Sequence, residues 1–211
     1  MRDSPHSLRA TRGHAIAGLG LAALASLAAA LSQAQPADAD RWRDRYVLAP
    51  QRSSVTFDVD AFSHSRIRMR FHRLDARLEG AQAGLDAARV TVTIDAGSIE
   101  ARPGFLSRIM RGAGVLDVAN YPEIRFVSTR FVLTGEGSGW LNGDLTIRGI
   151  TRPVSLRVTP GSATGNPLRD GTLAFSAIGE ASRREFGLSA WSAVVGDVVH
   201  MNIQVEFVHG P

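Results

Sequence analysis

Apolar and polar residues alternate at every second position through most of this chain, from residue 54 to residue 208. In the first such segment Val55, Phe57 and Val59 have one parity, and polar residues have the other. Successive side chains of a β-strand point to opposite faces of a sheet, so each segment reads as a strand with one dry and one wet face. The pattern therefore predicts an all-β protein of half-buried strands.

Eight main segments carry this pattern, and turn residues separate them. They are 54–61, 66–78, 88–95, 123–133, 139–147, 151–160, 171–182 and 197–208, with 46–49 leading into the first. The connections 135–139, 148–150 and 160–170 contain glycine and read as hairpin turns or loops. Eight strands with polar outer faces form either a barrel closed on itself or two packed sheets.

The segment 66–73, RIRMRFHR, indicates which of the two architectures applies. Its apolar residues fall on one face, and its basic residues fall on the other: Ile67, Met69 and Phe71 against Arg66, Arg68, Arg70 and His72. After Phe71 the parity flips, which predicts a bulge or corner near His72. A long strand that bends midway suits a barrel better than a flat sandwich. For the basic face we expect cross-strand ion pairs with Asp58 and Asp60, in preference to a calcium or paired-carboxylate site.

Charge and cysteine content exclude several classes of function. The net charge is +4, and residues 1–34 contribute two of these charges, because Arg2, Arg9 and Arg12 stand against Asp3. The remaining +2 is too small for a nucleic-acid footprint, and we expect no nucleic-acid partner. The chain has no cysteine, which excludes disulfides, a thiol nucleophile and a lipidated N-terminal cysteine.

Residues 1–34 have the features of a secretory signal peptide. A basic region is followed by an Ala/Leu-rich stretch and by small residues before a cut between Ala34 and Gln35. The alternative is a membrane anchor, but the stretch falls short of about 20 strongly apolar residues. Residues 35–45 are polar and read as a flexible tether, which leaves 46–208 as the folded domain. We expect the mature protein in the periplasm or outside the cell.

The connection from residue 100 to residue 122 has no strand pattern. Phe105, Leu106, Ile109 and Met110 share one helical face, which ends before Gly112. A connection this long in a compact domain is usually a lid or a binding element. We expect a short helix that caps one end of the barrel, and lid residues that contribute less to the core than strand residues do.

No catalytic or metal-binding constellation emerges from the sequence. The histidines at 64, 72, 200 and 209 have no ligand spacing, although a surface site at His64 and His72 is conceivable, and we expect no metal. The glycine-rich segment 135–139 joins two strands, so it is neither a nucleophile elbow nor a dinucleotide fingerprint. An esterase-like enzyme would need a nucleophile and base that no pattern here brings together.

Three motifs in order carry a family resemblance: DVANYPEIRF at 117–126, GDLTIRGITRPV at 143–154, and RREFGL at 183–188 followed by VGD at 195–197. They resemble the YceI-like family of bacterial secreted, lipocalin-like proteins, over residues 46–207. The resemblance implies an eight-stranded antiparallel lipocalin-like barrel that holds a polyisoprenoid or similar amphiphile in the periplasm without catalysis. Two departures stand out, Arg148 where the family often has His, and the small residues of segment 111–115.

These features predict a non-enzymatic carrier or reservoir for a long apolar ligand such as a polyisoprenoid, an isoprenoid quinone or a fatty amide, with no other cofactor. The inward residues expected to contact the ligand are Phe57, Val59, Ile67, Met69, Phe71, Val92, Ile94, Phe105, Ile109, Met110, Phe126, Leu145, Ile147, Phe175, Trp191, Met201 and Ile203. Arg108, Arg111 and Arg183 are the candidates for its headgroup. Transient membrane contact and a homodimer stay open. The alternative is an interaction module with a filled core and a basic docking face at Arg66, Arg68 and Arg70.

Overall fold

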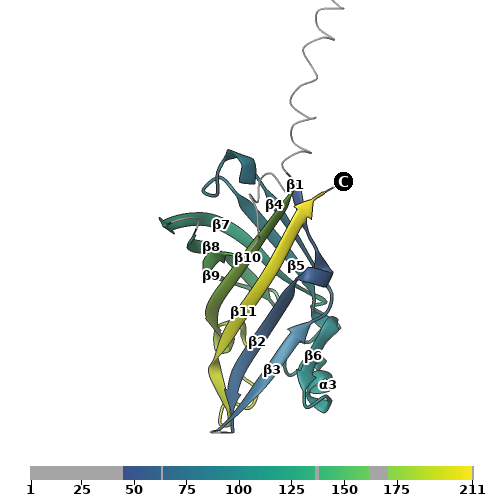
Figure 1. Cartoon of the computed structure of the whole chain (residues 1–211). Coiled ribbons are helices and arrows are strands. Elements are labelled where there is room, and N and C mark those ends of the chain that lie inside the picture. Colours follow the sequence, from purple (N-terminus) through teal and green to yellow (C-terminus); the bar gives the residue numbers. More distant parts are fainter. Residues whose placement is uncertain (1–44, 63, 136–137, 162–170, 211) are drawn as a thin grey trace, which may run out of the picture. The chain divides into compact units, whose positions relative to one another are not determined.

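The period-two segments form eleven antiparallel strands in one sheet (Figure 1). The computed structural model describes residues 45–62, 64–135, 138–161 and 171–210, all within one compact unit. The predicted signal peptide and, apart from Arg45, the tether lie outside the described residues, as do parts of the turns at 136–137 and 162–170. None of the helices in the described ranges is long and apolar enough to cross a membrane.

The strands and helices have the following bounds. The strands are β1 Arg45–Leu48, β2 Ser54–Ala61, β3 Ser65–Phe71, β4 Leu74–Glu79, β5 Arg89–Asp95, β6 Ile99–Arg102, β7 Glu123–Gly135, β8 Ser138–Ile147, β9 Ile150–Pro160, β10 Thr172–Ser182 and β11 Val195–His209. The α-helix is α3 Phe105–Arg111, and the short 3-10 helices are η1 Pro50–Arg52, η2 Ala81–Ala83, η3 Ala96–Ser98 and η4 Arg183–Phe186.

Three pairs of consecutive strands are the two halves of bent strands, so the eleven strands make an eight-stranded barrel. The bent strand β1/β2 is hydrogen-bonded to β3/β4, and β3/β4 is hydrogen-bonded to β5/β6. The strands from β7 to β11 follow in sequence order. Strand β11 closes the barrel by pairing with β1 along its last residues and with β2 along its earlier ones. Figure 1 shows β11 between β10 and β2. The predicted eight-stranded antiparallel barrel is confirmed.

Two short strands were missed by the sequence pattern. Segment 46–49 was expected only to lead into the first strand, but β1 pairs with both β4 and β11. The connection 100–122 was expected to lack strands, but β6 pairs with β3. Each has four residues, which is too short for a period-two pattern to stand out.

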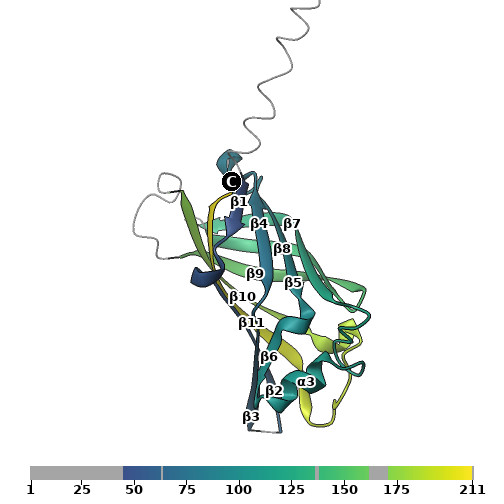
Figure 2. The same ribbon diagram turned by 90° about the vertical axis from the view of Figure 1, so that its right-hand side faces the viewer.

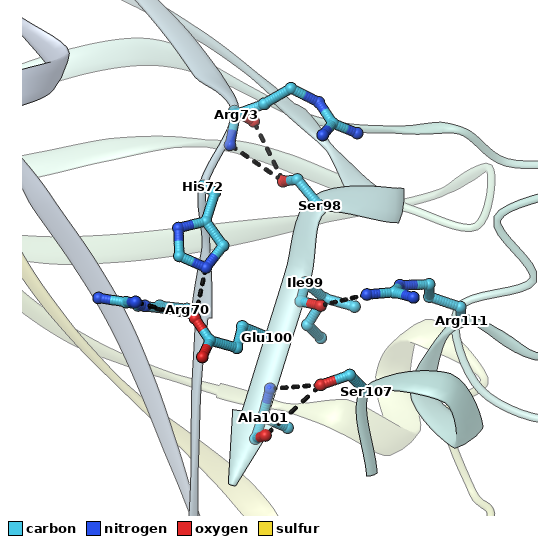
Figure 3. Close-up of polar contacts among 9 residues, drawn as sticks. All are labelled: Arg70, His72, Arg73, Ser98, Ile99, Glu100, Ala101, Ser107 and Arg111. Carbon is cyan, nitrogen blue, oxygen red and sulfur yellow. Dashed lines mark hydrogen bonds and ion pairs between the residues drawn. The ribbon is translucent and has the colours of Figure 1, made fainter. Parts of the chain in front are cut away.

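The predicted corner near His72 is confirmed, because β3 ends at Phe71 and β4 begins at Leu74. The buried Ser98 fixes this corner (Figure 3). Its hydroxyl accepts from the Arg73 backbone nitrogen at 3.1 Å and lies 2.6 Å from the Asp95 carbonyl, to which it can donate. The strand therefore bends at a point where its backbone polar groups stay paired, and both halves keep their apolar side chains inside.

The expected helix is α3, and it lies against β6 (Figure 2). Strand β6 pairs with β3 along one edge, and no described strand pairs with its other edge. Side chains of α3 contact that edge (Figure 3). Ser107 Oγ accepts from the Ala101 nitrogen at 2.8 Å, and Arg111 Nη2 donates to the Ile99 carbonyl at 3.1 Å. The helix thus covers part of a strand edge that would otherwise lack partners.

Candidate ligand-binding cavity

The barrel encloses one elongated cavity of about 840 Å³. This volume lies within the range of about 300–1,000 Å³ that is typical of small-molecule sites. Every residue that was predicted to contact the apolar part of the ligand lines the cavity, from Phe57 on β2 to Ile203 on β11. The structure thus brings together the whole predicted set, and the contact of these residues with a ligand stays a prediction.

The cavity follows most of the barrel's length. Phe207 and Val195, near the two ends of β11, both line it. The twelve residue steps between them span roughly 40 Å along the strand, at about 3.4 Å per residue. A strand tilt of about 40° reduces this to roughly 30 Å along the barrel axis. The cavity is therefore about as long as the hydrocarbon core of a bilayer is thick, which is also about 30 Å.

The polar residues of the cavity lining lie at one end. They are Ser65, Arg66, Arg102 and Arg183, and the other lining residues are apolar. The start of β3 and the end of β6 lie at the end of the barrel next to α3 (Figure 2). Arg183 of η4 donates to the Val195 carbonyl, and Val195 pairs with Ala61 at the end of β2, which leads to the start of β3. Phe62, Phe105 and Trp191 line the same end and are exposed to solvent. We call this end, defined by Phe62, Arg66, Arg102, Phe105 and Trp191, the mouth.

Arg183 has a structural role that the sequence did not reveal. Its buried guanidinium donates to the carbonyls of Gly196 at 2.7 Å, Ala190 at 2.9 Å and Val195 at 2.8 Å, and also to that of Leu188. These four bonds occupy four of the five N–H groups of an arginine. Burial also lowers the pKa of Arg183 below its usual value. The side chain thus holds the loop from 188 to 196, and its predicted contact with a headgroup stays a prediction.

Asp197 fixes the other side of the same loop. Its carboxylate accepts from the Ser182 hydroxyl at 2.7 Å and from the Arg184 backbone nitrogen at 3.1 Å. The Ser182 hydrogen bond, with smaller contributions from Arg184, holds the pKa of Asp197 below its usual value. The motifs at 183–188 and 195–197, singled out in the sequence, thus build the loop that carries Trp191 to the mouth.

The other two predicted headgroup residues do not line the cavity. Arg108 and Arg111 are exposed on α3, and Arg111 bonds the β6 backbone. Two arginines that the sequence reading did not select, Arg66 and Arg102, lie at the mouth instead. Arg66 pairs with Asp60 at 3.0 Å, whereas the Arg102 side chain has no hydrogen bond or ion pair to any described residue. Arg102 was missed because β6 was not expected to be a strand.

The helical segment was expected to be a lid that contributes less to the core than the strands do, but one of its residues lies within the core. Met110 is buried in a core cluster with Ile99, Ala101 and Leu116. Ile109 is partly exposed and lines the cavity. Met110 is buried because α3 occupies the position beside β6 that a neighbouring strand would otherwise fill. Apolar side chains of the helix therefore pack against β6.

The arginine-rich face of β3 is electrically balanced. Arg68 pairs with Asp58 at 2.9 Å, and Arg70 pairs with Glu100 at 2.9 Å, in addition to the Arg66–Asp60 pair. The expected cross-strand ion pairs are confirmed. His72 also contacts Glu100, at 2.5 Å, and the pKa of Glu100 is lowered by Arg70 first and His72 second. The alternative of a filled core with a basic docking face lacks both of its premises, because the core is hollow and these arginines each face a carboxylate.

Metal ligands do not cluster in the part of the chain that the structure describes, where no group of three or more His, Asp or Glu side chains could hold an ion. His72 contacts Glu100, and His200 contacts Glu180 at 3.0 Å. Both contacts lie between exposed side chains.

An eight-stranded up-and-down barrel around one long apolar cavity defines a lipocalin-like protein. The model of the YceI-like domain matches residues 46–207, so the chain belongs to the YceI-like family. A UPF0312 protein of Pseudomonas putida is 28% identical over 187 residues, which cover 89% of this chain and 95% of that protein. One from Shewanella denitrificans is 25% identical over 154 residues, which cover 73% and 81%.

Solved structures share the fold. Burkholderia cenocepacia BcnA matches with a TM-score of 0.67 and 20% identity, over 75% of this chain and 98% of that chain. A polyisoprenoid binding domain from Saccharophagus degradans, implicated in plant cell wall breakdown, matches with a TM-score of 0.58 and 14% identity, over 78% and 98%. At these identities the likeness concerns the fold alone.

Proposed function

We propose that this protein is a non-catalytic carrier or reservoir that holds one long apolar molecule in its barrel. The observation that carries this proposal is the cavity of about 840 Å³, which is apolar along its length and polar only at the mouth. A ligand that fits such a site has a long apolar tail and a single polar head. The described part of the cavity lining contains no carboxylate or histidine, which supports a binding role over a catalytic one.

The ligand class that fits is a polyisoprenoid, an isoprenoid quinone or a fatty amide. The structural relative from Saccharophagus degradans is described as a polyisoprenoid binding domain, which supports the first of these. The tail would run along the cavity between Phe207 and Val195, and the head would lie at the mouth near Arg102. Because the Arg102 side chain has no partner among the described residues, its N–H groups would be able to donate hydrogen bonds to the polar head.

The physical need for such a protein follows from the cost of exposing a tail to water. That cost is about 0.8 kcal/mol for each CH2 group, so a long chain does not leave a membrane unaided. The barrel interior replaces the bilayer as the apolar solvent. With the signal peptide removed near Ala34, the protein would act in the periplasm or outside the cell.

The experiment is to purify the secreted protein, extract it with organic solvent and analyse the extract by mass spectrometry. The proposal predicts a long-chain lipid in near-equal molar amount to the protein. An unrelated secreted protein purified in the same way provides the background. Repeated absence of any lipid above that background would contradict a carrier or reservoir.

A further inference from the structure

Large apolar side chains around the mouth are turned toward solvent. Phe62 is 64% exposed, Phe105 is 66% exposed and Trp191 is 51% exposed, and all three also line the cavity. Val194 is exposed beside them and lines the cavity too. We call these four residues the apolar rim. Exposing this much aromatic surface to water around one opening is unfavourable. An exposed apolar patch of this kind is typical of an interaction site.

The rim is held in place by defined contacts. The Phe62 backbone nitrogen donates to the Val194 carbonyl at 2.7 Å, which ties the β2–β3 turn to the loop before β11. The nitrogen of Val194 donates in turn to the Trp191 carbonyl at 3.0 Å. Arg183 holds the same loop from inside through the Ala190 and Val195 carbonyls. The aromatic side chains are therefore presented by a fixed scaffold.

The backbone at two rim residues is strained. Phe62 has a φ of 51° and Trp191 has a φ of 54°. This left-handed region is unfavourable for bulky L-residues, because the Cβ atom crowds the neighbouring carbonyl. Strain of this kind is found mainly at functional sites. Here the strained residues are two exposed aromatics, so burial of their side chains in the folded chain does not offset the cost of the strain.

Two arginines next to the rim have no ion pair with a described residue. Arg102 lies at the mouth, and Arg108 is exposed one helical turn beyond Phe105. Neither side chain has an ion pair with a described residue, in contrast to Arg66, Arg68 and Arg70. An apolar surface flanked by such arginines is complementary to an anionic lipid surface, into which aromatic rings insert while arginines contact phosphates.

We infer that the apolar rim docks the mouth of the barrel onto an anionic lipid bilayer. The reason for choosing a bilayer over a protein partner is that the rim residues also line the cavity, so a docked mouth would open directly into the hydrocarbon. A lipid tail then passes between bilayer and barrel without contacting water. The inference rests on the proposed function, because docking would serve the transfer of a lipid. Vesicle binding itself is measured independently of whether a ligand is bound.

The test is co-flotation of the purified barrel with vesicles of equimolar phosphatidylcholine and phosphatidylglycerol. The rim variant carries Phe105→Ser and Trp191→Ser, both at exposed positions where folding should be retained. We expect its vesicle affinity to fall by roughly tenfold or more, as the loss of two inserted aromatic groups implies. The matched control carries Leu133→Ser and Ile178→Ser, two exposed apolar residues away from the mouth, and should bind like the unmodified protein. Circular dichroism checks that both variants are folded.

The charge part is tested with Arg102→Gln and Arg108→Gln together. These changes should weaken binding to the anionic vesicles and leave the weaker binding to pure phosphatidylcholine unchanged. Arg130→Gln is the control, because Arg130 is also exposed and without an ion pair in the described structure, but lies on β7 away from the mouth.

Equal flotation of the rim variant and the unmodified protein would overturn the inference. So would the absence of vesicle binding by a protein that carries extractable lipid, which would leave the carrier proposal intact. A third result would assign the rim to a protein partner instead. The protein would then bind native membranes but not pure lipid vesicles, and protease treatment of the membranes would abolish the binding. Conversely, vesicle binding by a protein without lipid would support docking and count against the carrier proposal alone.

Discussion

Ser107 Oγ lies 2.8 Å from the backbone nitrogen of Ala101, so a helix side chain takes the place of a neighbouring strand at the open edge of β6. Both residues are buried. The same hydroxyl lies 3.4 Å from the Ala101 carbonyl, so one side chain serves both backbone groups. The barrel wall beside the cavity is therefore closed by a helix, and the contact between α3 and β6 is part of the fold.

Replacing Ser107 with Ala should destabilise this wall. The change leaves the N–H group of Ala101 without a partner in a buried position, which costs about 1–3 kcal/mol. Urea unfolding measures the loss, and hydrogen exchange should become faster at residues 99–102. Arg108→Ala on the exposed side of the same helix is the control and should change stability by no more than about 0.5 kcal/mol. Equal effects of the two changes would contradict the role of Ser107.

Arg183→Met should release the loop at the mouth. Methionine keeps an apolar side chain in the cavity wall but leaves the carbonyls that Arg183 binds without their donor. We expect a loss of about 1–3 kcal/mol, since several carbonyls of a partly buried loop lose the donor that they share. Limited proteolysis should show new cleavage between residues 188 and 196. Arg130→Met, at an exposed position of β7 without an ion pair in the described structure, should produce neither effect.

The acid dependence of stability should include Asp197. Its folded-state pKa lies below the usual value of 3.8, so the charged form stabilises the folded protein. This contribution is complete above the unfolded pKa and is lost as pH falls through the folded pKa. Stability should therefore not change through this group between about pH 7 and 5, and should fall below about pH 4. Asp197→Asn should lower stability at neutral pH and flatten the fall in acid, as urea titrations at several pH values would show. If stability depended on pH in the same way in the variant and in the unmodified protein, Asp197 would not contribute to the loss of stability in acid.

The two faces of β3 should respond in opposite ways. Met69→Arg places an unpaired charge in the cavity, and we expect loss of folding or of bound lipid. Arg68→Ala removes an exposed ion pair with Asp58 and should cost about 0.5 kcal/mol. Thermal unfolding and lipid extraction compare the two variants. Similar tolerance at both positions would contradict the assignment of inner and outer faces.

Most of the barrel was predictable from the sequence, because alternation is a local property. The bend at His72 was also visible, since parity flips between Phe71 and Leu74. What stayed hidden depends on contacts between distant segments. The β6 strand is too short to show a period, and the four carbonyls that Arg183 binds come from residues 188–196 folding back over it. For the same reason Arg102 was missed at the mouth, while the inward residues of the strands were found by parity alone.

The most direct test of the carrier proposal is native mass spectrometry of the purified protein and of one lumen-blocking variant. Ala177→Phe adds a ring inside the cavity, and Ile178→Phe places the same ring at the neighbouring outward position of β10, outside the cavity. Because the cavity is hollow, the inner ring should cost little stability but should exclude an extended tail. We expect one long-chain lipid per barrel in the unmodified protein and in Ile178→Phe, and a lipid-free mass for Ala177→Phe. A lipid-free unmodified protein, or equal lipid content in all three, would contradict binding in the lumen.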